Sequence, residues 1–324
     1  MTASPAPVNT DRKFMKRIFI SREGLRSGWS LALFLFIYAT LTLGAQFSFA
    51  KFPVLRDWAA KQPHGVISAL GQIEFTGLEL LILLVAVGVT SKVEKRSFKY
   101  YGLSTAGRDY LRFLQGMAFG FGMASILMGL IALLGGFSVS GFAISETAIF
   151  SNAFLYGVGF GLVGFFEEFA FRGYMQATLQ RGIGVWPAAV ILSLAFGAMH
   201  LPNLQGAWVG ALVAACFGIL GVFSIQRTGS LWFIIGTHTA FDWGIAFFYS
   251  APIAGLPAQG HLLNVSLNGP MWLTGGHAGP VGSIITFAVF GLAGLAIHFC
   301  FAKIKNAPGK VIAVASYDSS SVNG

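Results

Sequence analysis

The sequence predicts an all-α fold, a polytopic helix bundle embedded in a membrane, and three observations support this prediction. Hydrophobic residues make up 55% of the 324 residues and charged residues only 10%, whereas charged residues are about a quarter of a soluble chain. The mean hydropathy is +0.70. Apolar stretches of about 20 residues, the length needed to cross the hydrocarbon core, recur along the chain.

These apolar stretches predict about eight membrane-spanning helices, the fifth of which is short. Helices of this length bury their backbone polar groups in intrahelical hydrogen bonds, as lipid requires. The predicted spans are residues 29–49, 66–90, 113–134, 148–171, 186–200, 206–225, 231–250 and 281–301.

The net charge of +9 comes from basic clusters in the polar segments between these spans. If the chain crosses at every span, all the clusters fall on one side, and the positive-inside rule makes that side cytoplasmic. Both termini are then cytoplasmic, and the membrane is a bacterial-type inner or plasma membrane or an ER-like membrane. Because no soluble domain is predicted to carry the charge, a nucleic-acid-binding surface is excluded. The clusters contain Arg12, Lys13, Lys16, Arg17, Arg22, Arg26, Lys92, Lys95, Arg96, Lys99, Arg108, Arg112, Arg172, Arg181, Arg227, Lys303, Lys305 and Lys310.

The chain divides into three parts by composition. Residues 1–28 form a basic, cytoplasmic N-terminal arm, and residues 303–324 form a Ser-rich cytoplasmic tail expected to be disordered. Between them, residues 29–302 form the transmembrane domain, with the notable motifs in 150–250. The last outer loop, 251–280, contains no Asp, Glu, Lys or Arg. It is expected to be either a lid or a loop at the headgroup level.

Small residues within the spans indicate close helix packing. Gly157, Gly161 and Gly164 lie on nearly one helical face, which allows another helix to approach closely. Cys216 and Cys300 lie in apolar spans and are predicted to be packed, unpaired residues and not a disulfide or a metal pair.

Two carboxylates and an arginine interrupt the fourth span, in the run Phe165–Arg172. A charged side chain near the bilayer centre costs about 2.5 to 3.5 kcal/mol on insertion scales, so these groups need partners or a wet cavity. On a helix, Glu168 and Arg172 stand four residues apart and meet, whereas Glu167 points about 100° away. We therefore predict a structural Glu168–Arg172 ion pair and a free Glu167.

Two later spans each carry polar groups at the same helical spacing. Phe196 precedes His200 by four residues, and His238 precedes Asp242 by four. Pro202 prevents the helix from continuing past His200. Since a helix end inside the membrane is tolerated only against protein or water, a cavity is expected near His200.

This set of groups favours hydrolysis of an amide bond inside the membrane. Removal from water makes a carboxylate a stronger base, which suits Glu167 as a general base. A water held between Glu167 and His200 would attack a carbonyl group, with His238 stabilising the oxyanion. Two histidines and a carboxylate are also a common zinc set, so Glu167, His200 and His238 would be the ligands of a zinc-dependent version. Because no His-Glu-x-x-His occurs, the metal-free mechanism without a cofactor is preferred.

The three motifs together resemble the CAAX-protease and bacteriocin-processing family of intramembrane proteases, which includes the type II CAAX prenyl endopeptidases. The resemblance covers roughly residues 150–250, and three motifs in order are far more specific than one. The motifs are Glu-Glu-x-x-x-Arg at Glu167, Glu168 and Arg172, Phe-x-x-x-His at Phe196 and His200, and His-x-x-x-Asp at His238 and Asp242.

The resemblance implies a role for each motif residue. It implies that Glu167 activates water with His200 as its partner, that His238 and the fourth residue beyond it support the oxyanion, and that Glu168 and Arg172 are mainly structural. It also implies a peptide substrate that is membrane-associated or has a prenylated C-terminus.

Position 242 departs from the family pattern, because the eukaryotic enzymes look to have Asn where this chain has Asp242. An ionised Asp cannot donate a hydrogen bond to an oxyanion. Asp242 must therefore be protonated, orient His238 as an acceptor, or bind a metal.

Two other functions remain open at the sequence level. A non-catalytic membrane scaffold or bacteriocin-immunity-type protein would use the same cavity to bind a peptide or lipid. A proton-coupled transporter would use Glu79 and Glu167 as relay groups, because an intramembrane carboxylate is by default a functional candidate. In each case the partners are the lipid bilayer and a membrane ligand, with no nucleic acid.

Overall fold

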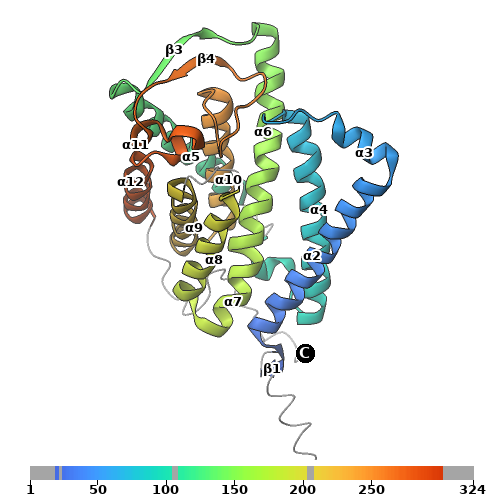
Figure 1. Ribbon diagram of the computed structural model, residues 1–324. Coiled ribbons are helices and arrows are strands. Elements are labelled where there is room, and N and C mark those ends of the chain that lie inside the picture. Colours follow the sequence, from blue (N-terminus) through green and yellow to red (C-terminus); the bar gives the residue numbers. More distant parts are fainter. Residues whose placement is uncertain (1–18, 22–23, 104–108, 203–207, 302–324) are drawn as a thin grey trace, which may run out of the picture.

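The computed structural model of the chain describes residues 19–21, 24–103, 109–202 and 208–301. The predicted N-terminal arm lies partly outside these ranges, and the predicted tail, 303–324, lies wholly outside them. The described part is a bundle of long helices with short strands at both of its ends (Figure 1).

Each of the eight predicted spans coincides with a helix. The helices that fill them are α2 (Ser27–Lys51), α4 (Ala69–Glu94), α5 (Asp109–Leu133), α6 (Glu146–Glu168), α8 (Val185–His200), α9 (Trp208–Thr228), α10 (Leu231–Trp243) and α12 (Ile285–Cys300). Shorter helical elements are α3 (Pro53–Ala60), α7 (Gln176–Ile183), α11 (Met271–Thr274), the 3-10 turns η1 (Phe98–Tyr101), η4 (Gly276–Ala278) and η5 (Pro280–Gly282), and the π-helical turns η2 (Phe169–Met175) and η3 (Gly244–Phe248).

The chain is an integral membrane protein, but the number of eight crossings is not confirmed. Within the described residues, five helices are long and apolar enough to cross a bilayer: α2, α4, α5, α9 and the continuous helix Glu146–Ile183 that joins α6, η2 and α7. The apolar helices α8 and α12 are shorter, with 16 residues each. At 1.5 Å per residue, each is about 24 Å long, less than the roughly 30 Å hydrocarbon core.

The described part is mostly helical, consistent with the all-α prediction, and it also contains two short pairs of strands. Strand β3 (Phe137–Phe142) pairs antiparallel with β4 (Leu263–Leu267), and β1 (Ile20–Ser21) pairs with β2 (Gly24–Leu25). Strand β4 therefore lies within the segment 251–280, which was expected to be a loop. Strand β4 alternates apolar and polar residues along its whole length, from Leu263 to Leu267, a strand signal that the sequence analysis did not use.

Helix α10 is held tightly between α5 and α6 by small residues. A Cβ atom at Gly116 or Gly120 of α5 would overlap the backbone of α10 at Phe233 and Thr237. On the other side, a Cβ atom at Gly164 of α6 would meet the Thr239 hydroxyl at 2.7 Å. Of the glycine face predicted for the fourth span, Gly164 makes this close contact, whereas a Cβ atom at Gly157 or Gly161 would meet its nearest neighbour only at 4.0 Å.

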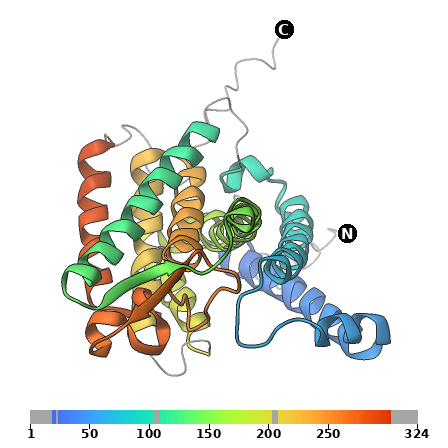
Figure 2. The ribbon, with the colours of Figure 1, turned by 90° about the horizontal axis from the view of Figure 1, so that it is seen from above.

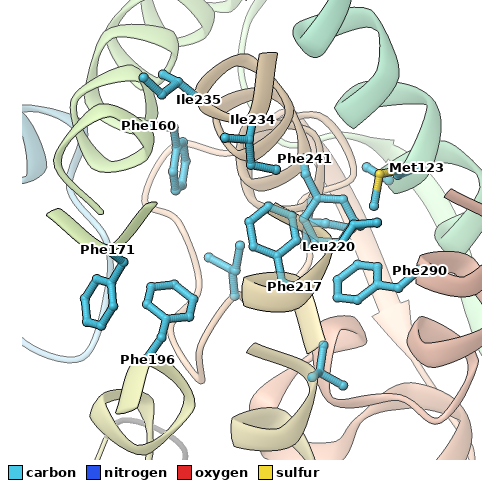
Figure 3. Close-up of a cluster of buried hydrophobic side chains, with 14 of the residues drawn as sticks. Met123, Phe160, Phe171, Phe196, Phe217, Leu220, Ile234, Ile235, Phe241 and Phe290 are labelled. Carbon is cyan, nitrogen blue, oxygen red and sulfur yellow. The ribbon is translucent and has the colours of Figure 1, made fainter. Parts of the chain in front are cut away.

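Aromatic side chains fill the interior of the bundle. Figure 3 shows Phe217, Phe241 and Phe290 gathered on one side and the rings of Phe171 and Phe196 side by side on the other. Seen from above, α12 lies at one edge of the bundle and α2 with α3 at the opposite edge (Figure 2).

The two cysteines are free, as predicted, but they are exposed on the bundle surface and not packed inside it. Neither Cys216 nor Cys300 is among the residues that line the cavity described below.

Candidate active site

The polar groups of three helices line one cavity of about 320 Å³. The predicted convergence of the three motifs is therefore what the structure shows. Glu167 comes from α6, Phe196 and His200 from α8, and His238 and Asp242 from α10. The remaining lining is mostly apolar: Ile67, Gln72, Phe160, Val163, Gly210, Val213, Ala214, Phe217, Phe241, Ile253, Ala254, Leu256, Val281 and Phe290.

A change of helical form occurs directly after the two glutamates. Helix α6 ends at Glu168 and continues without a break into the π-helical turn η2, which contains Arg172. Such π-helical turns are rare and often occur at functional sites. Glu167 points into the cavity, with 22% of its side chain exposed, whereas the Glu168 side chain is fully buried.

Glu168 binds two partners through the same oxygen. Its Oε1 atom lies 3.1 Å from Nη1 of Arg172 and 2.8 Å from Nδ1 of His238. The predicted Glu168–Arg172 ion pair is confirmed by this geometry. The contact with His238 was not predicted, and it gives Glu168 a second task, to orient the imidazole. Above the pair, the Arg172 guanidinium stacks on the Phe196 ring, 4.2 Å from its centre.

The second nitrogen of His238 faces the cavity and its carboxylates. Nε2 lies 3.3 Å from Oδ2 of Asp242 and 3.7 Å from Oε2 of Glu167. Since carboxylate oxygens accept hydrogen bonds, a ring that donates at both nitrogens to Glu168 and Asp242 is an imidazolium. Of the three roles left open for Asp242, this placement favours orientation of His238.

His200 presents one nitrogen to the cavity. Its Nδ1 lies 2.8 Å from the carbonyl oxygen of Phe196, one helical turn earlier, and the two rings pack edge to face at 4.7 Å. A carbonyl oxygen only accepts, so the proton of a neutral His200 sits on Nδ1 and Nε2 remains an acceptor. His200 is also the last residue of α8, as the sequence predicted from Pro202.

The donor set does not fit the zinc site considered from the sequence. A zinc site needs three or four protein ligands arranged around one point about 2.0 to 2.3 Å from each of them. Across the described ranges, no group of three or more His, Cys, Asp or Glu residues is arranged to hold a metal ion. No step of the hydrolysis mechanism described below therefore uses a metal ion.

Gln72 of α4 is a site residue that the sequence analysis left unassigned. It lines the same cavity as Glu167, and its Oε1 atom is buried without a hydrogen-bond partner among the described residues. A glutamine inside an apolar span was the available signal. Glu79, the other intramembrane candidate, is exposed and does not line the cavity.

The comparison with known families agrees with this site. Residues 149–244 match the family model described as type II CAAX prenyl endopeptidase Rce1-like, which is a protease family. No curated protein and no solved structure matches the chain. The matched segment contains all three motifs, from Glu167 to Asp242. Residues 149–244 of this integral membrane protein are therefore similar to the domain that this Rce1-like family model describes.

Proposed function

We propose that the chain is an intramembrane endopeptidase that hydrolyses a peptide bond with a water molecule activated by Glu167. The observation that carries the proposal is the placement of Glu167, His200, His238 and Asp242 on one cavity whose other walls are mostly apolar. Ionisable groups rarely gather inside a membrane without a role. The match to a protease family supports the same reaction class.

The first step is attack by water. A water between Glu167 and Nε2 of His200 gives a proton to the Glu167 carboxylate while its oxygen bonds to the carbonyl carbon of the substrate. The carbonyl electron pair moves onto its oxygen, and the Nε2–H group of His238 stabilises the oxyanion.

The second step is loss of the amine. The oxyanion electrons reform the carbonyl group, the C–N bond breaks, and Glu167 returns its proton to the leaving nitrogen. The products are a carboxylic acid and an amine, and Glu167 is again ionised. Glu168 and Asp242 hold His238 in place during both steps. In this scheme the substrate is a membrane-associated peptide, and a prenylated C-terminal peptide is the form that the family description names.

The proposal is tested with purified protein in liposomes and a fluorogenic peptide library that includes prenylated and unprenylated members. Glu167→Gln is expected to lower cleavage by about a hundredfold or more, the usual contribution of a general base. Glu79→Gln is a matched control, because Glu79 is exposed and lies outside the cavity lining. This variant should cleave as fast as the parent.

Two results would contradict the proposal. One is full activity of Glu167→Gln, and the other is a parent protein that cleaves no library member faster than Glu167→Gln does. A chelator is added in a parallel experiment. Activity that survives the chelator supports the metal-free route, and a metal-reversible loss of activity supports the zinc-dependent alternative.

A further inference from the structure

The cavity wall carries one polar side chain that the proposed mechanism does not use. Apart from the four ionisable groups of the three motifs, Gln72 is the only polar side chain among the described residues that line the cavity. It belongs to α4, outside the segment that matches the family model. Its Oε1 atom is buried without a partner among the described residues, and such an atom destabilises the fold. An unpaired amide in an apolar wall therefore indicates a role in binding.

The side chain of Gln72 contacts α6 at a position that has no side chain of its own. Helices α4 and α6 run side by side (Figure 1), and Gln72 packs on the backbone of α6 at Gly159. A Cβ atom at Gly159 would lie 2.8 Å from Oε1 and 3.3 Å from Cδ of Gln72. The glycine thus makes room for the amide next to Phe160, which is itself a lining residue of the cavity.

The amide of Gln72 keeps a donor available for a bound molecule. Its Nε2 atom is not among the buried atoms that lack a partner, and it makes no hydrogen bond with another described residue. The backbone of Ile67, which lines the same cavity, is by contrast fully paired. Its N–H group donates to the carbonyl oxygen of Pro257, and its carbonyl oxygen accepts from the N–H group of Gln259 and from the hydroxyl of Tyr156. The free donor in this part of the wall is therefore Nε2 of Gln72.

The cavity follows one face of α6 from the level of Gln72 to the proposed general base. Phe160, Val163 and Glu167 follow one another at intervals of three and four residues, and all three line the cavity. Gly159, on which Gln72 packs, lies eight residues before Glu167, which is about 12 Å along the helix axis. Because an extended peptide advances about 3.3 Å per residue, this distance corresponds to about three to four residues of a substrate.

We infer that Gln72 is a substrate-binding residue that donates a hydrogen bond to the peptide backbone about three to four residues from the bond that Glu167 hydrolyses. The inference rests on the proposed endopeptidase activity. Every peptide unit carries a carbonyl oxygen that accepts such a bond, and a peptide that enters an apolar cavity loses water and needs a partner for this group. Recognition at Gln72 thus selects an extended peptide of sufficient length and not a particular side chain.

Gln72→Met tests this role, because it keeps the length of the side chain and removes the amide. The probe is the library peptide that the parent cleaves best, extended to at least five residues on each side of the cleaved bond. In liposomes, we expect kcat/KM to fall about tenfold, as for the loss of one hydrogen bond. The unfolding temperature should stay at or above that of the parent, because an unpartnered buried oxygen is removed, whereas a structural role would lower it. Gln46→Met is the matched control, at an exposed position of the apolar helix α2 outside the cavity lining, and should behave as the parent.

Gly159→Ala displaces the same amide without changing it. The added Cβ would meet the flexible end of the Gln72 side chain, so this side chain has to move while the backbone stays in place. We expect the same loss of kcat/KM as for Gln72→Met, and little further loss when the two substitutions are combined. Gly157→Ala is the control, since its Cβ would meet its nearest neighbour only at 4.0 Å.

Shortened and ester-containing peptides locate the contact on the substrate. Parent and Gln72→Met should cleave equally well a peptide that ends within two residues of the cleaved bond on the side that contacts Gln72. Replacing single amides by esters weakens the carbonyl acceptor. One replacement about three to four residues from the cleaved bond should lower kcat/KM of the parent several-fold and leave that of Gln72→Met nearly unchanged.

The inference is overturned if Gln72→Met or Gly159→Ala cleaves the long peptide as fast as the parent, or if Gln72→Met loses as much activity on the shortened peptides. Either result, with cleavage that still depends on Glu167, leaves the protease proposal intact. If the parent cleaves no peptide, the protease proposal falls, and binding of the fluorescently labelled long peptide is measured by anisotropy. About tenfold weaker binding to Gln72→Met would then keep the contact with Gln72, whereas equal binding or no binding would remove it as well.

Discussion

Glu167 and Glu168 are neighbours in the sequence but have different partners in the structure. Glu167 faces the cavity, and Glu168 is buried against Arg172 and His238. Removing one member of a buried ion pair leaves the other charge without compensation and typically costs about 3 to 5 kcal/mol. The two glutamates should therefore respond differently to the same substitution.

We expect Glu168→Gln to lower the unfolding temperature of the protein clearly, because it leaves the Arg172 guanidinium buried without its counter-charge. Activity should fall as well, since His238 loses the acceptor at Nδ1. The matched variant Glu167→Gln should lose activity and keep the unfolding temperature of the parent. Thermal unfolding in detergent measures both, and equal unfolding temperatures for Glu168→Gln and the parent would contradict the structural role of the pair.

Asp242 is argued to act through His238, so its test must separate orientation from chemistry. Asp242→Asn keeps an acceptor oxygen near Nε2 of His238, 3.3 Å away in the parent, whereas Asp242→Ala removes it. We expect Asp242→Ala to lower kcat by about a hundredfold, the loss that a misplacement of 1 Å can cause, and Asp242→Asn to recover most of it. Steady-state kinetics in liposomes decides the point, and equally inactive variants would show that the carboxylate charge itself is needed.

At the scale of elements, the site depends on how closely α10 approaches α5 and α6. The glycine face on α6 was found from the sequence, but the equally tight contact of Gly116 and Gly120 with α10 was not predicted. Spacing along one helix indicates which residues share a face, but it does not identify the partner helix. The same limit explains why the Glu168–Arg172 pair was predicted and the Glu168–His238 contact was missed.

Gly120→Ala is expected to disturb the site from a distance, because the added Cβ would overlap the backbone oxygen of Thr237, next to His238. Helix α5 would have to move away from α10, so both the unfolding temperature and the cleavage rate should fall. Gly122→Ala on the same helix is the matched control, since a Cβ there meets nothing within 4 Å. Similar behaviour of the two variants in unfolding and cleavage assays would argue against close packing as the cause.

At the scale of the whole molecule, the sequence predicted the long helices best, because a long apolar stretch is a clear pattern. All eight apolar spans correspond to helices, and the three motifs lie in order within the segment that matches the Rce1-like family model. Helix α3 was missed because its eight residues carry little periodicity, whereas β3 and β4 do alternate apolar and polar residues, a signal that was overlooked beside the long apolar spans. The unbroken helix through η2 was missed because a π-helical turn has no sequence signature that spacing reveals.

A second polar cluster joins four elements of the bundle, outside the cavity. The Tyr101 hydroxyl of η1 donates to Oε2 of Glu94 in α4 at 2.5 Å, and Arg181 of α7 bonds to Oε1 of Glu94 and to the Ser30 hydroxyl of α2. Both Tyr101 and Glu94 are buried. Burial, followed by the hydrogen bond to Glu94, raises the pKa of Tyr101 above its usual value of 10.0, so the phenol remains a donor at neutral pH.

Tyr101→Phe removes only this hydroxyl and leaves a buried carboxylate oxygen without its donor, which typically costs about 1 to 3 kcal/mol. We expect a lower unfolding temperature for this variant. Below that temperature it should cleave at the rate of the parent, because Tyr101 does not line the cavity.

A group whose folded pKa is raised stabilises the fold fully below its unfolded pKa and loses that contribution as pH rises through the folded value. The difference between parent and variant should therefore be constant from about pH 6 to 8 and shrink only above about pH 10. Tyr110→Phe, at an exposed position, is the control. Thermal unfolding across this pH range checks the prediction, and no difference between parent and Tyr101→Phe at pH 7 would contradict it.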